Sequence, residues 1–340
     1  MIWEQAALLL LAVLLSAALT LLVRRYALSR GVLDHPNARS SHSHPTPRGG
    51  GMSIVIVVSI TAALFIYHDV SDAVPWAILS GGLAVALVGY LDDRSALPVR
   101  VRMIVHVASA AWAVFLLGGM PPIQWGATVV HLGFWGDVLA VFALVWMLNL
   151  FNFMDGIDGI AASEATFVAA AGAGLCWLVG IHSATSVTAA AVAAASLGFL
   201  LWNWPPAKIF MGDVGSGYLG YVLGVLALAA GCRSPAILWA WLILGGVFFV
   251  DATVTLVRRL LRGDRVYEAH RSHAYQWLAR RWQSHKSVTI TVTAINLLWL
   301  LPCASLAALH PRWALWMTLV ALIPLGVGAF VAGSGRREGI

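Results

Sequence analysis

The stretch DVLAVFALVWMLNLFNFMDGIDG, residues 137–159, joins an apolar run to a cluster of amides and carboxylates. An α-helix rises about 1.5 Å per residue, so about 20 apolar residues cross the ~30 Å hydrocarbon core of a bilayer. Asn149, Asn152, Asp155 and Asp158 recur every three residues where that run ends, a spacing that keeps helical neighbours on adjoining faces. We therefore expect a membrane-spanning helix that delivers polar oxygens to the membrane surface.

The composition of the whole chain predicts the same class of protein. Of its 340 residues, 60% are hydrophobic and only 11% are charged, and the mean hydropathy is +0.83. A soluble domain of this composition would expose apolar surface almost everywhere. We therefore expect an all-α integral membrane protein, a single polytopic domain over residues 1–340 with about eleven transmembrane helices. The predicted helices are 3–23, 52–67, 74–91, 101–118, 137–151, 160–181, 187–202, 214–232, 236–257, 288–308 and 313–332.

The distribution of cations between the loops predicts the orientation. The first apolar run has no basic segment before it, and Arg24 and Arg25 follow it, so we interpret it as a retained helix rather than a signal peptide. Only Arg233 and Arg312 fall in the loops of one side, which leaves 19 of the 21 Lys and Arg residues in the alternate loops. By the positive-inside rule the N-terminus is outside and the C-terminus is cytoplasmic. The pI near 9.6 is then a topology signal, and we expect no nucleic-acid partner.

The acids at the ends of the predicted helices gather on the cytoplasmic side. They are Asp92, Asp93, Asp155, Asp158 and Asp213. We expect an active site that faces the cytoplasm, formed by the cytoplasmic loops 24–51, 92–100, 152–159, 203–213 and 258–287. On the opposite side, residues 119–136 predict a small outer hairpin.

The polar groups of the opening stretch are typical of a magnesium site. Mg²⁺ takes oxygen ligands, commonly one or two from the protein together with substrate phosphates. Gly156 and Gly159 lie between and after the two aspartates, where they let the backbone turn close to a ligand. Capping of the next helix is the alternative interpretation. Capping accounts for one or two of the four polar residues, so the cluster favours a functional site.

Two further acidic stretches each allow two interpretations. In GYLDDRSALPVRVR, residues 89–102, Asp92 and Asp93 repel each other unless a cation neutralises them or one keeps its proton. In one interpretation they are an acidic pair that meets Arg94 and Arg100 at the interface. In the other, one of the two acids is a base or lies near a bound metal. In NWPPAKIFMGDVGSGYLG, residues 203–220, Asp213 is either the N-cap of the next helix or part of a glycine-rich phosphate site beside Lys208.

The last cytoplasmic loop and one deeper acid complete the candidates. In RRLLRGDRVYEAHRSHAYQWLARRWQSHK, residues 258–286, His270, Arg271 and His273 form a compact cationic set. The loop either binds phosphates or contains a basic amphipathic helix that lies on anionic lipid. Arg48, in the proline- and glycine-rich first loop, adds another cation. Asp251 lies about 10 Å inside its predicted helix, and such an acid is functional, snorkels to the membrane surface or is paired with a neighbour.

Five ordered stretches together resemble the motifs of one family. LDHPNARSSH, YLDDRSALP, NLFNFMDGIDGIA, IFMGDVGS and EAHRSHAYQ are similar to those of the bacterial polyprenyl-phosphate N-acetylhexosamine-1-phosphate transferases, glycosyltransferase family 4, over essentially the whole chain. The resemblance implies an enzyme of the bacterial inner membrane that needs Mg²⁺, with Mn²⁺ as a substitute. It moves a sugar 1-phosphate from a UDP-N-acetylhexosamine to undecaprenyl phosphate and releases UMP. The partners implied are these two substrates, membrane lipid and a second copy in a homodimer.

The resemblance also implies roles for individual residues. Asp92 would deprotonate or position the lipid phosphate, and Arg271 would be the strongest phosphate donor of the basic loop. The implied catalytic residues are Asp92, Asp93, Asp155 and Asp158; the metal ligands are Asn152 and Asp213; and the substrate-binding residues are Asn149, Asp158, Lys208, His270, Arg271, His273 and Arg48.

Departures from the family's pattern bear on the pathway. The first acidic motif reads DDRSA, with Ala96 where some relatives carry a third acid, so a metal scheme that requires three acids loses a ligand here. HRSHAYQ differs from the histidine run of the peptidoglycan enzyme and resembles the branch that uses UDP-N-acetylfucosamine or UDP-N-acetylquinovosamine besides UDP-N-acetylglucosamine. We expect initiation of O-antigen (lipopolysaccharide) or a related surface polysaccharide. The alternatives are lipid I synthesis for peptidoglycan and, from another class, a multi-span transporter.

Overall fold

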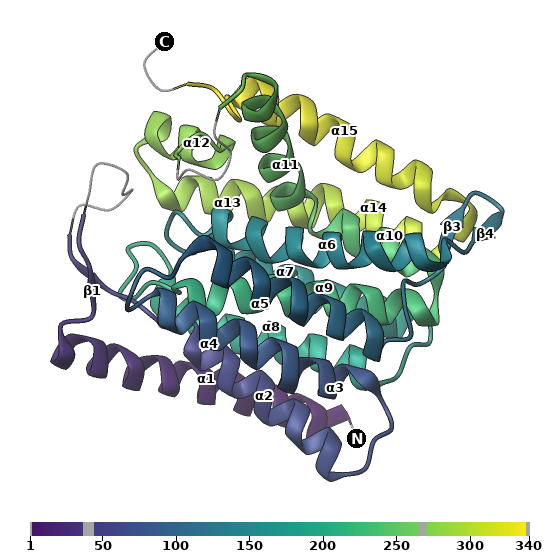
Figure 1. Ribbon diagram of the computed structural model, residues 1–340, viewed down its shortest axis with the longest axis horizontal. Coiled ribbons are helices and arrows are strands. Elements are labelled where there is room, and N and C mark those ends of the chain that lie inside the picture. Colours follow the sequence, from purple (N-terminus) through teal and green to yellow (C-terminus); the bar gives the residue numbers. More distant parts are fainter. Residues whose placement is uncertain (1, 37–43, 265–269, 338–340) are drawn as a thin grey trace.

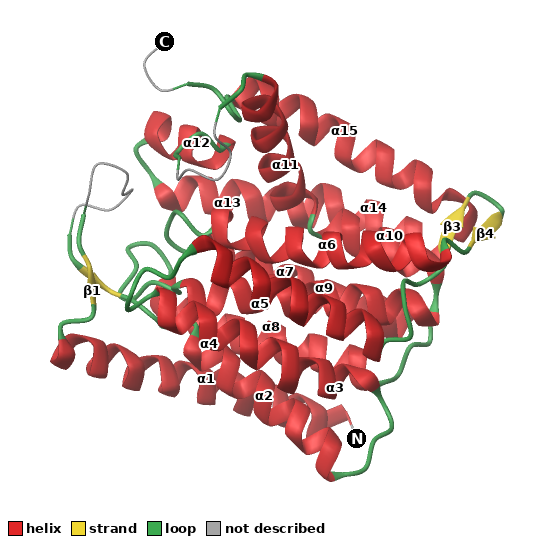
Figure 2. Cartoon of the chain, viewed as in Figure 1, coloured by secondary structure: helices red, strands yellow, loops and turns green. Residues whose placement is uncertain are grey.

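The helices of the chain form one bundle. The computed structural model describes residues 2–36, 44–264 and 270–337, so parts of the predicted loops 24–51 and 258–287 lie outside the described residues. Most helices run between an end near β1 and an end that carries β3 and β4 (Figure 1). Loops and two short strand pairs connect the helices (Figure 2). We call the end near β1 the acid end, defined by the connections 44–51, 93–98, 155–159 and 204–212, and the other end the hairpin end.

The N-terminal half begins with two helices joined across a short strand pair. These are α1 (Ile2–Arg30), β1 (Leu33–Asp34), β2 (Thr46–Pro47) and α2 (Met52–Tyr67). A continuous rod follows, made of α3 (Ala73–Ala77), a π-helical turn (Ile78–Gly82) and α4 (Leu83–Asp92). After α5 (Val99–Leu116), the strands β3 (Ile123–Trp125) and β4 (Thr128–Val130) pair as an antiparallel hairpin, and α6 (Gly133–Met154) returns to the acid end.

The C-terminal half contains the remaining helices. They are α7 (Ile160–Leu178), α8 (Ala184–Asn203), α9 (Asp213–Arg233), α10 (Pro235–Leu244), α11 (Gly246–Leu261), α12 (Ala274–Trp282), α13 (His285–Ile295), a π-helical turn (Asn296–Leu300), α14 (Leu301–Leu309), a 3₁₀ turn (Pro311–Trp313) and α15 (Ala314–Ala332).

The structure confirms an all-α architecture with many apolar helices. In the described part of the chain, nine helices are long and apolar enough to cross a membrane, and the bent pair α10 and α11 gives a tenth. Helix α2 has 16 residues and is shorter than the spans. The length criterion thus supports nine or ten spans where the sequence predicted about eleven, although a helix lies in every predicted segment.

Helix α9 lies at the centre of the bundle. Within its most apolar window 94% of the residues are buried, against 11% for α1 and 17% for α15. Both α4 and α6 pack directly on α9. A Cβ at Gly220 would meet the carbonyl oxygen of Met147 in α6, so this close approach requires glycine. Helices α1 and α15 instead expose large apolar side chains on their outer faces, as helices in contact with lipid do.

The predicted helix 236–257 is broken in the structure. Helices α10 and α11 meet at Gly245 with a bend of 72°. Helix α11 therefore stands across the direction of the other helices near the acid end (Figure 1). The prediction of one continuous helix was wrong here, because the run WAWLILGGVFFV is apolar on both sides of the break and hydropathy carries no information on the direction of the chain. The break places α11 and the following α12 beside the end of α6.

Candidate active site

Three of the predicted acids meet where α4 and α9 come together. Asp92 ends α4, Asp93 follows it, and Asp213 begins α9. The two helices approach this closely because residue 89 is glycine: a Cβ there would lie 2.5 Å from the carbonyl oxygen of Asp213. Sequence positions 120 residues apart are thereby joined in one acidic cluster.

Asp93 holds the start of α9. Its Oδ1 accepts the backbone N–H of Asp213 at 2.9 Å, and its Oδ2 accepts that of Val214 at 3.2 Å. These are orphan donors of a helix N-terminus, and a carboxylate is the favoured group there. The N-cap position itself is Gly212, with φ of +77°. The interpretation of Asp213 as an N-cap was therefore wrong: the capping oxygens come from Asp93, and the Asp213 side chain is left for other contacts.

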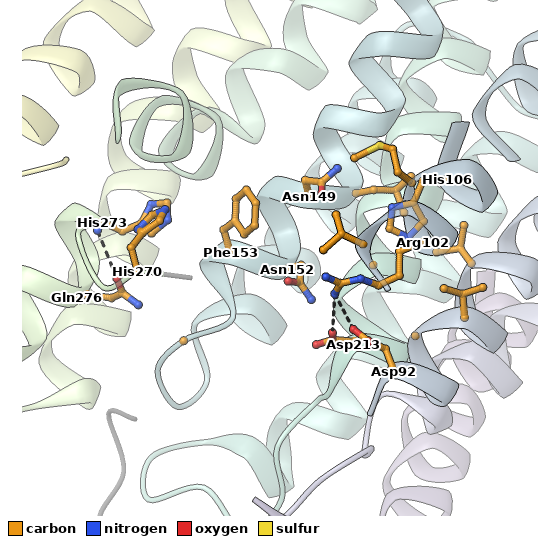
Figure 3. A pocket seen from close by; sticks show the side chains of 18 of the residues that line it. Asp92, Arg102, His106, Asn149, Asn152, Phe153, Asp213, His270, His273 and Gln276 are labelled. Atoms are coloured by element: carbon orange, nitrogen blue, oxygen red, sulfur yellow. Dashed lines mark hydrogen bonds and ion pairs between the residues drawn. The ribbon is translucent and has the colours of Figure 1, made fainter. Parts of the chain in front are cut away.

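Two arginines neutralise the acidic cluster. Arg48 Nη2 lies 2.7 Å from Asp93 Oδ1 and 2.8 Å from Asp213 Oδ1. Arg102 Nη1, from α5, lies 2.6 Å from Asp92 Oδ2 and 3.8 Å from Asp213 Oδ2 (Figure 3). Asp92 Oδ1 also accepts the backbone N–H of Leu97 at 2.6 Å. Arg48, predicted from the sequence to add positive charge, lies beside two of these acids. The sequence indicated Arg102 only as one of the cations that set the topology.

Burial shifts the proton affinities of the cluster. It raises the pKa of Asp93 to about 6, although Arg48 acts in the opposite direction. Burial lowers the pKa of the Arg48 guanidinium, but Asp93 and Asp213 outweigh it and leave the pKa above its ordinary value. Burial, followed by the neighbouring Asp213, raises the pKa of Asp155 well above its ordinary value. Among the described residues, the three carboxylates of the cluster are paired with two guanidinium groups, so a further cation would neutralise the remaining charge when all three are ionised.

The two asparagines of the opening stretch lie on α6 and face the cluster. Asn152 Nδ2 donates to Ser216 Oγ of α9 at 3.2 Å, and Asn149 Nδ2 donates to the Val145 carbonyl oxygen at 2.7 Å. Asn152 lines the same pocket as Asp92 and Asp213. Among the described residues, no three His, Cys, Asp or Glu side chains are placed to hold a metal by themselves. The Asp213 carboxylate and the Asn152 amide oxygen fit Mg²⁺, which takes one or two ligands from the protein and completes its shell with water and substrate phosphates.

Of the four polar residues that recur every three positions, only the first two, Asn149 and Asn152, lie on a helix. Helix α6 stops at Met154, so Asp155 and Asp158 follow in a turn that closes at Gly159, with φ of +77°. Asp158 Oδ2 accepts the Ala207 backbone N–H at 3.0 Å, and its Oδ1 lies 3.3 Å from His285 Nδ1. Asp155 and Asp158 therefore lie beside the pocket rather than along one helix face with the asparagines. His285 lies near the end of the predicted basic loop, where α13 begins, and carried no sequence signal of its own.

The basic loop supplies the opposite wall. His270 and His273 line the pocket, with ring centroids 5.0 Å apart and stacked. Phe153 stands between this pair and the acids (Figure 3), and its ring centroid lies 6.2 Å from that of His273. Arg271 is in the same loop, and its carbonyl oxygen accepts from Arg280 Nη2 at 3.0 Å. The sequence predicted this histidine pair as part of the site. The pair lies close to the acids because of the way α11 and α12 fold.

Lys208 has a different environment from the other predicted cations. Its Nζ lies 5.5 Å from the centre of the Trp202 ring, a cation–π contact, and its carbonyl oxygen accepts from Arg24 Nε at 3.1 Å. It does not belong to the described residues that line the pocket. Lys208 thus lies at the acid end but outside the acidic cluster.

The pocket itself has a polar and an apolar part and a volume of about 370 Å³. The polar part contains Asp92, Arg102, Asn152, Asp213 and the two histidines. The apolar part continues along α4, α5 and α6 and is lined by Val85, Val88, Met103 and Leu148. His106 lies where the two parts meet, one turn from Arg102 on α5, and its buried Nδ1 has no hydrogen-bond partner among the described residues. Such a pocket suits a molecule with a phosphate at one end and a hydrocarbon chain at the other.

Comparison with known proteins gives a consistent result. The sequence model described as Glycosyl transferase family 4 matches residues 75–231. A probable undecaprenyl-phosphate N-acetylglucosaminyl 1-phosphate transferase of Bacillus subtilis is 29% identical over 93% of this chain and 88% of its own length. Two decaprenyl-phosphate N-acetylglucosaminephosphotransferases are also similar. That of Mycolicibacterium smegmatis is 31% identical over 79% of this chain and 74% of its own length, and that of Mycobacterium tuberculosis is 28% identical over 91% and 84%.

Proposed function

The chain belongs to the polyprenyl-phosphate N-acetylglucosamine-1-phosphate transferase family, and from this premise we propose that it transfers an N-acetylhexosamine 1-phosphate from a UDP-sugar to undecaprenyl phosphate. A lipid phosphate oxygen attacks the phosphorus that carries the sugar, and the bond from that phosphorus to the UMP oxygen breaks. The products are UMP and undecaprenyl-pyrophosphoryl sugar. The observation that carries the proposal is the pocket in which Asp92, Asp213 and Asn152 face two histidines beside an apolar groove.

The acceptor end of this pocket suits a lipid phosphate. Arg102 lines the pocket beside the groove, and a guanidinium binds phosphate oxygens with two N–H groups. Asp92 lies 2.6 Å from that guanidinium and would position the phosphate or take its proton. His106 offers a ring nitrogen one turn deeper, where the phosphate ends and the first isoprene unit begins. Asp93 acts through Asp213, because it fixes the first turn of α9.

The donor end suits a UDP-sugar. His270 and His273 face the acids across Phe153, at a position where they would hydrogen-bond the pyrophosphate or the sugar. Arg271 of the same loop and Arg48 would neutralise phosphate charge. Asp155 and Asp158, on the turn after α6, would lie on the nucleotide side, with Asn149 at the pocket wall. Lys208 would contribute only long-range positive charge from its place over Trp202.

Asn152 and Asp213 are the residues that would hold Mg²⁺, for which Mn²⁺ would substitute. Their oxygens meet the preference of this ion for hard ligands and for incomplete protein cages. Bound there, the ion would neutralise charge on the pyrophosphate as the bond to UMP breaks. Arg48 and Arg102 already pair with Asp213, so a bound ion would share this carboxylate with their guanidinium groups.

We further propose the cellular setting. The protein is a multi-pass membrane protein. The excess of Lys and Arg at the acid end supports an active site on the cytoplasmic face of the bacterial inner membrane. The HRSHAYQ motif supports initiation of O-antigen or a related surface polysaccharide rather than peptidoglycan. A homodimer is the assembly that we propose for the membrane.

Product analysis tests the proposed reaction. Purified protein is incubated with undecaprenyl phosphate, Mg²⁺ and one donor at a time: UDP-N-acetylglucosamine, UDP-N-acetylfucosamine, UDP-N-acetylquinovosamine or UDP-N-acetylmuramoyl-pentapeptide. We expect UMP and a lipid-linked pyrophosphoryl sugar from one of the first three. Turnover of the pentapeptide donor alone would assign the protein to peptidoglycan. Release of UDP would mean glycosyl transfer and refute the proposed chemistry, and no nucleotide product from folded protein would leave a transporter as the better hypothesis.

A further inference from the structure

Asp251 is a buried carboxylate that the proposed reaction does not use. It lies on α11 and is 4% exposed. Its Oδ1 accepts the backbone N–H of Ala274 at 2.8 Å and the hydroxyls of Ser334 at 2.7 Å and Thr255 at 3.2 Å. Its Oδ2 accepts the backbone N–H of Tyr275 at 3.1 Å. Two of these four donors are the first backbone groups of α12, and a third belongs to a segment 83 residues further along the chain.

The loop 270–273, which precedes α12, is held from its other side as well. The Ser272 carbonyl oxygen accepts the Gly335 backbone N–H at 2.6 Å. The Arg271 carbonyl oxygen accepts Arg280 Nη2 at 3.0 Å. Ser272 Oγ also lies 3.0 Å from His270 Nδ1. The backbone of this loop is therefore held by two polar contacts from outside it, and a side-chain contact within the loop joins Ser272 to His270.

The segment 333–337, which we call the clasp, folds back from α15 onto α11. Gly333 turns the chain with φ of +105°. Arg258 Nη1 donates to the Ser334 carbonyl oxygen at 2.5 Å, and Arg337 Nη2 lies 3.2 Å from Asp264 Oδ1. A Cβ at Gly335 would lie 2.9 Å from the Arg258 Cβ, so glycine is needed for this fit. The clasp reaches both Asp251 and the loop 270–273, although it is far from them in sequence.

Helix α12 contacts the end of α6 and so links the loop 270–273 to the pocket. Tyr275 Oη donates to the Phe153 carbonyl oxygen at 2.8 Å, at the end of α6. A Cβ at Gly156 would meet the same hydroxyl, so the turn after α6 and α12 are in direct contact. Gln276 Oε1 accepts the His273 backbone N–H at 3.3 Å. The histidines therefore face the acids because the start of α12 is held in place. Asp251 holds it by accepting the first two backbone N–H groups of this helix.

We propose that Asp251 and the clasp are positioning elements that set the distance between the histidines of the loop 270–273 and the acidic cluster. The inference rests on the proposed function, because it assigns the loop to the donor pyrophosphate. Asp251 is not among the described residues that line the pocket, so it acts through the backbone of α12 and through His273, whose Nδ1 lies 3.7 Å from Asp251 Oδ1. Loosening either element should weaken donor binding and leave binding of the lipid acceptor unchanged.

Four variants test the proposal. Asp251→Asn replaces one acceptor oxygen with a donor, and Ser334→Ala removes the hydroxyl that joins the clasp to Asp251. Ser334→Thr keeps that hydroxyl. Thr255→Val is the matched control, because the Thr255 hydroxyl also donates to Asp251 but joins two residues of the same helix. Thr255 approaches Gly335 of the clasp with backbone atoms, which the substitution keeps. We measure kcat, the KM of the UDP-sugar, the KM of undecaprenyl phosphate, and hydrogen exchange of peptides that cover residues 270–276.

Loss of one hydrogen bond to a charged group weakens binding on the order of tenfold. We expect Ser334→Ala and Asp251→Asn to raise the KM of the UDP-sugar by about that factor and to speed exchange at 274 and 275. The KM of undecaprenyl phosphate should stay within about twofold in both. Ser334→Thr should restore wild-type values, and Thr255→Val should keep them. A merely structural loss would lower the amount of active protein without this split between the two substrates.

The outcomes separate this inference from the proposed function. Wild-type donor KM and wild-type exchange in Ser334→Ala would overturn the positioning role, as would equal changes in both KM values. If Asp251→Asn does not fold, the comparison of Ser334→Ala with Ser334→Thr still decides. If the wild-type protein releases no UMP, the proposed function fails; wild-type exchange rates in Ser334→Ala would then overturn the clasp too, and faster exchange at 274 and 275 would support its contact with α12.

Discussion

The substitution Gly89→Ala tests whether the closeness of α4 and α9 builds the active site. The new Cβ would lie 2.5 Å from the Asp213 carbonyl oxygen and 2.7 Å from the Val214 nitrogen, both backbone atoms that cannot rotate away. Ordinary contact begins at 3.4 Å, so the helices must separate by about 0.9 Å, the difference between the two distances. The bond from the Asp213 N–H to Asp93, now 2.9 Å, would then stretch to about 3.8 Å and break.

The consequence should be larger for catalysis than for folding. Overpacking of this kind costs about 1–3 kcal/mol of stability, whereas a 1 Å misplacement of reacting groups costs about 100-fold in rate. We expect kcat/KM for UMP release to fall about 100-fold while the melting temperature in detergent falls by a few degrees. Gly174→Ala is the matched control, because a Cβ there meets nothing within 4 Å. Wild-type kcat/KM in folded Gly89→Ala protein would refute the claim that this approach sets the geometry of the acids.

Further predictions concern the metal and the acceptor. Asn152→Ala and Asp213→Ala should abolish UMP release from protein whose melting temperature is near that of the wild type, and normal turnover in either would remove that residue from the proposed metal site. EDTA should stop the reaction and added Mg²⁺ should restore it; activity that survives chelation would contradict the metal requirement. Arg102→Gln should raise the KM of undecaprenyl phosphate tenfold or more, on the order of one charge-assisted phosphate contact, and an unchanged KM would place the acceptor elsewhere. His106→Leu should raise the same KM by about threefold to tenfold, which a measured value equal to the wild type would disprove.

The sequence was sufficient to predict the helices and the end of the bundle that holds the acids. A membrane sets both the length and the polarity of a span, so an apolar run reports a helix almost directly. The break at Gly245 could not be predicted from hydropathy, because the run stays apolar while the chain changes direction by 72°. The pair Gly245 and Gly246 was the only local signal of the bend.

The partners of the acids required the fold. Arg102 was assigned to topology because its charge counts in the positive-inside rule wherever it points, and only the packing of α5 brings it to Asp92. The capping of α9 by Asp93 joins residues 120 apart and leaves no pattern in either stretch. Asp251 was singled out as an acid inside its helix, but its contact with Ser334 is invisible before the chain folds. Sequence identified the chemistry of these residues, and packing determined what each one acts on.

The 120 residues between Asp93 and Asp213 also have a consequence for biogenesis. At about 5–20 residues per second, translation needs roughly 6–24 s to proceed from the first acid to the second. During that interval α4 has already been made while the N–H groups that Asp93 accepts do not yet exist. The incomplete bundle therefore carries Asp93 without the helix that it caps, and it lacks its most buried helix. This is the period in which an insertase, a chaperone or a membrane protease would encounter the chain, before arrival of α9 completes both the interior and the site.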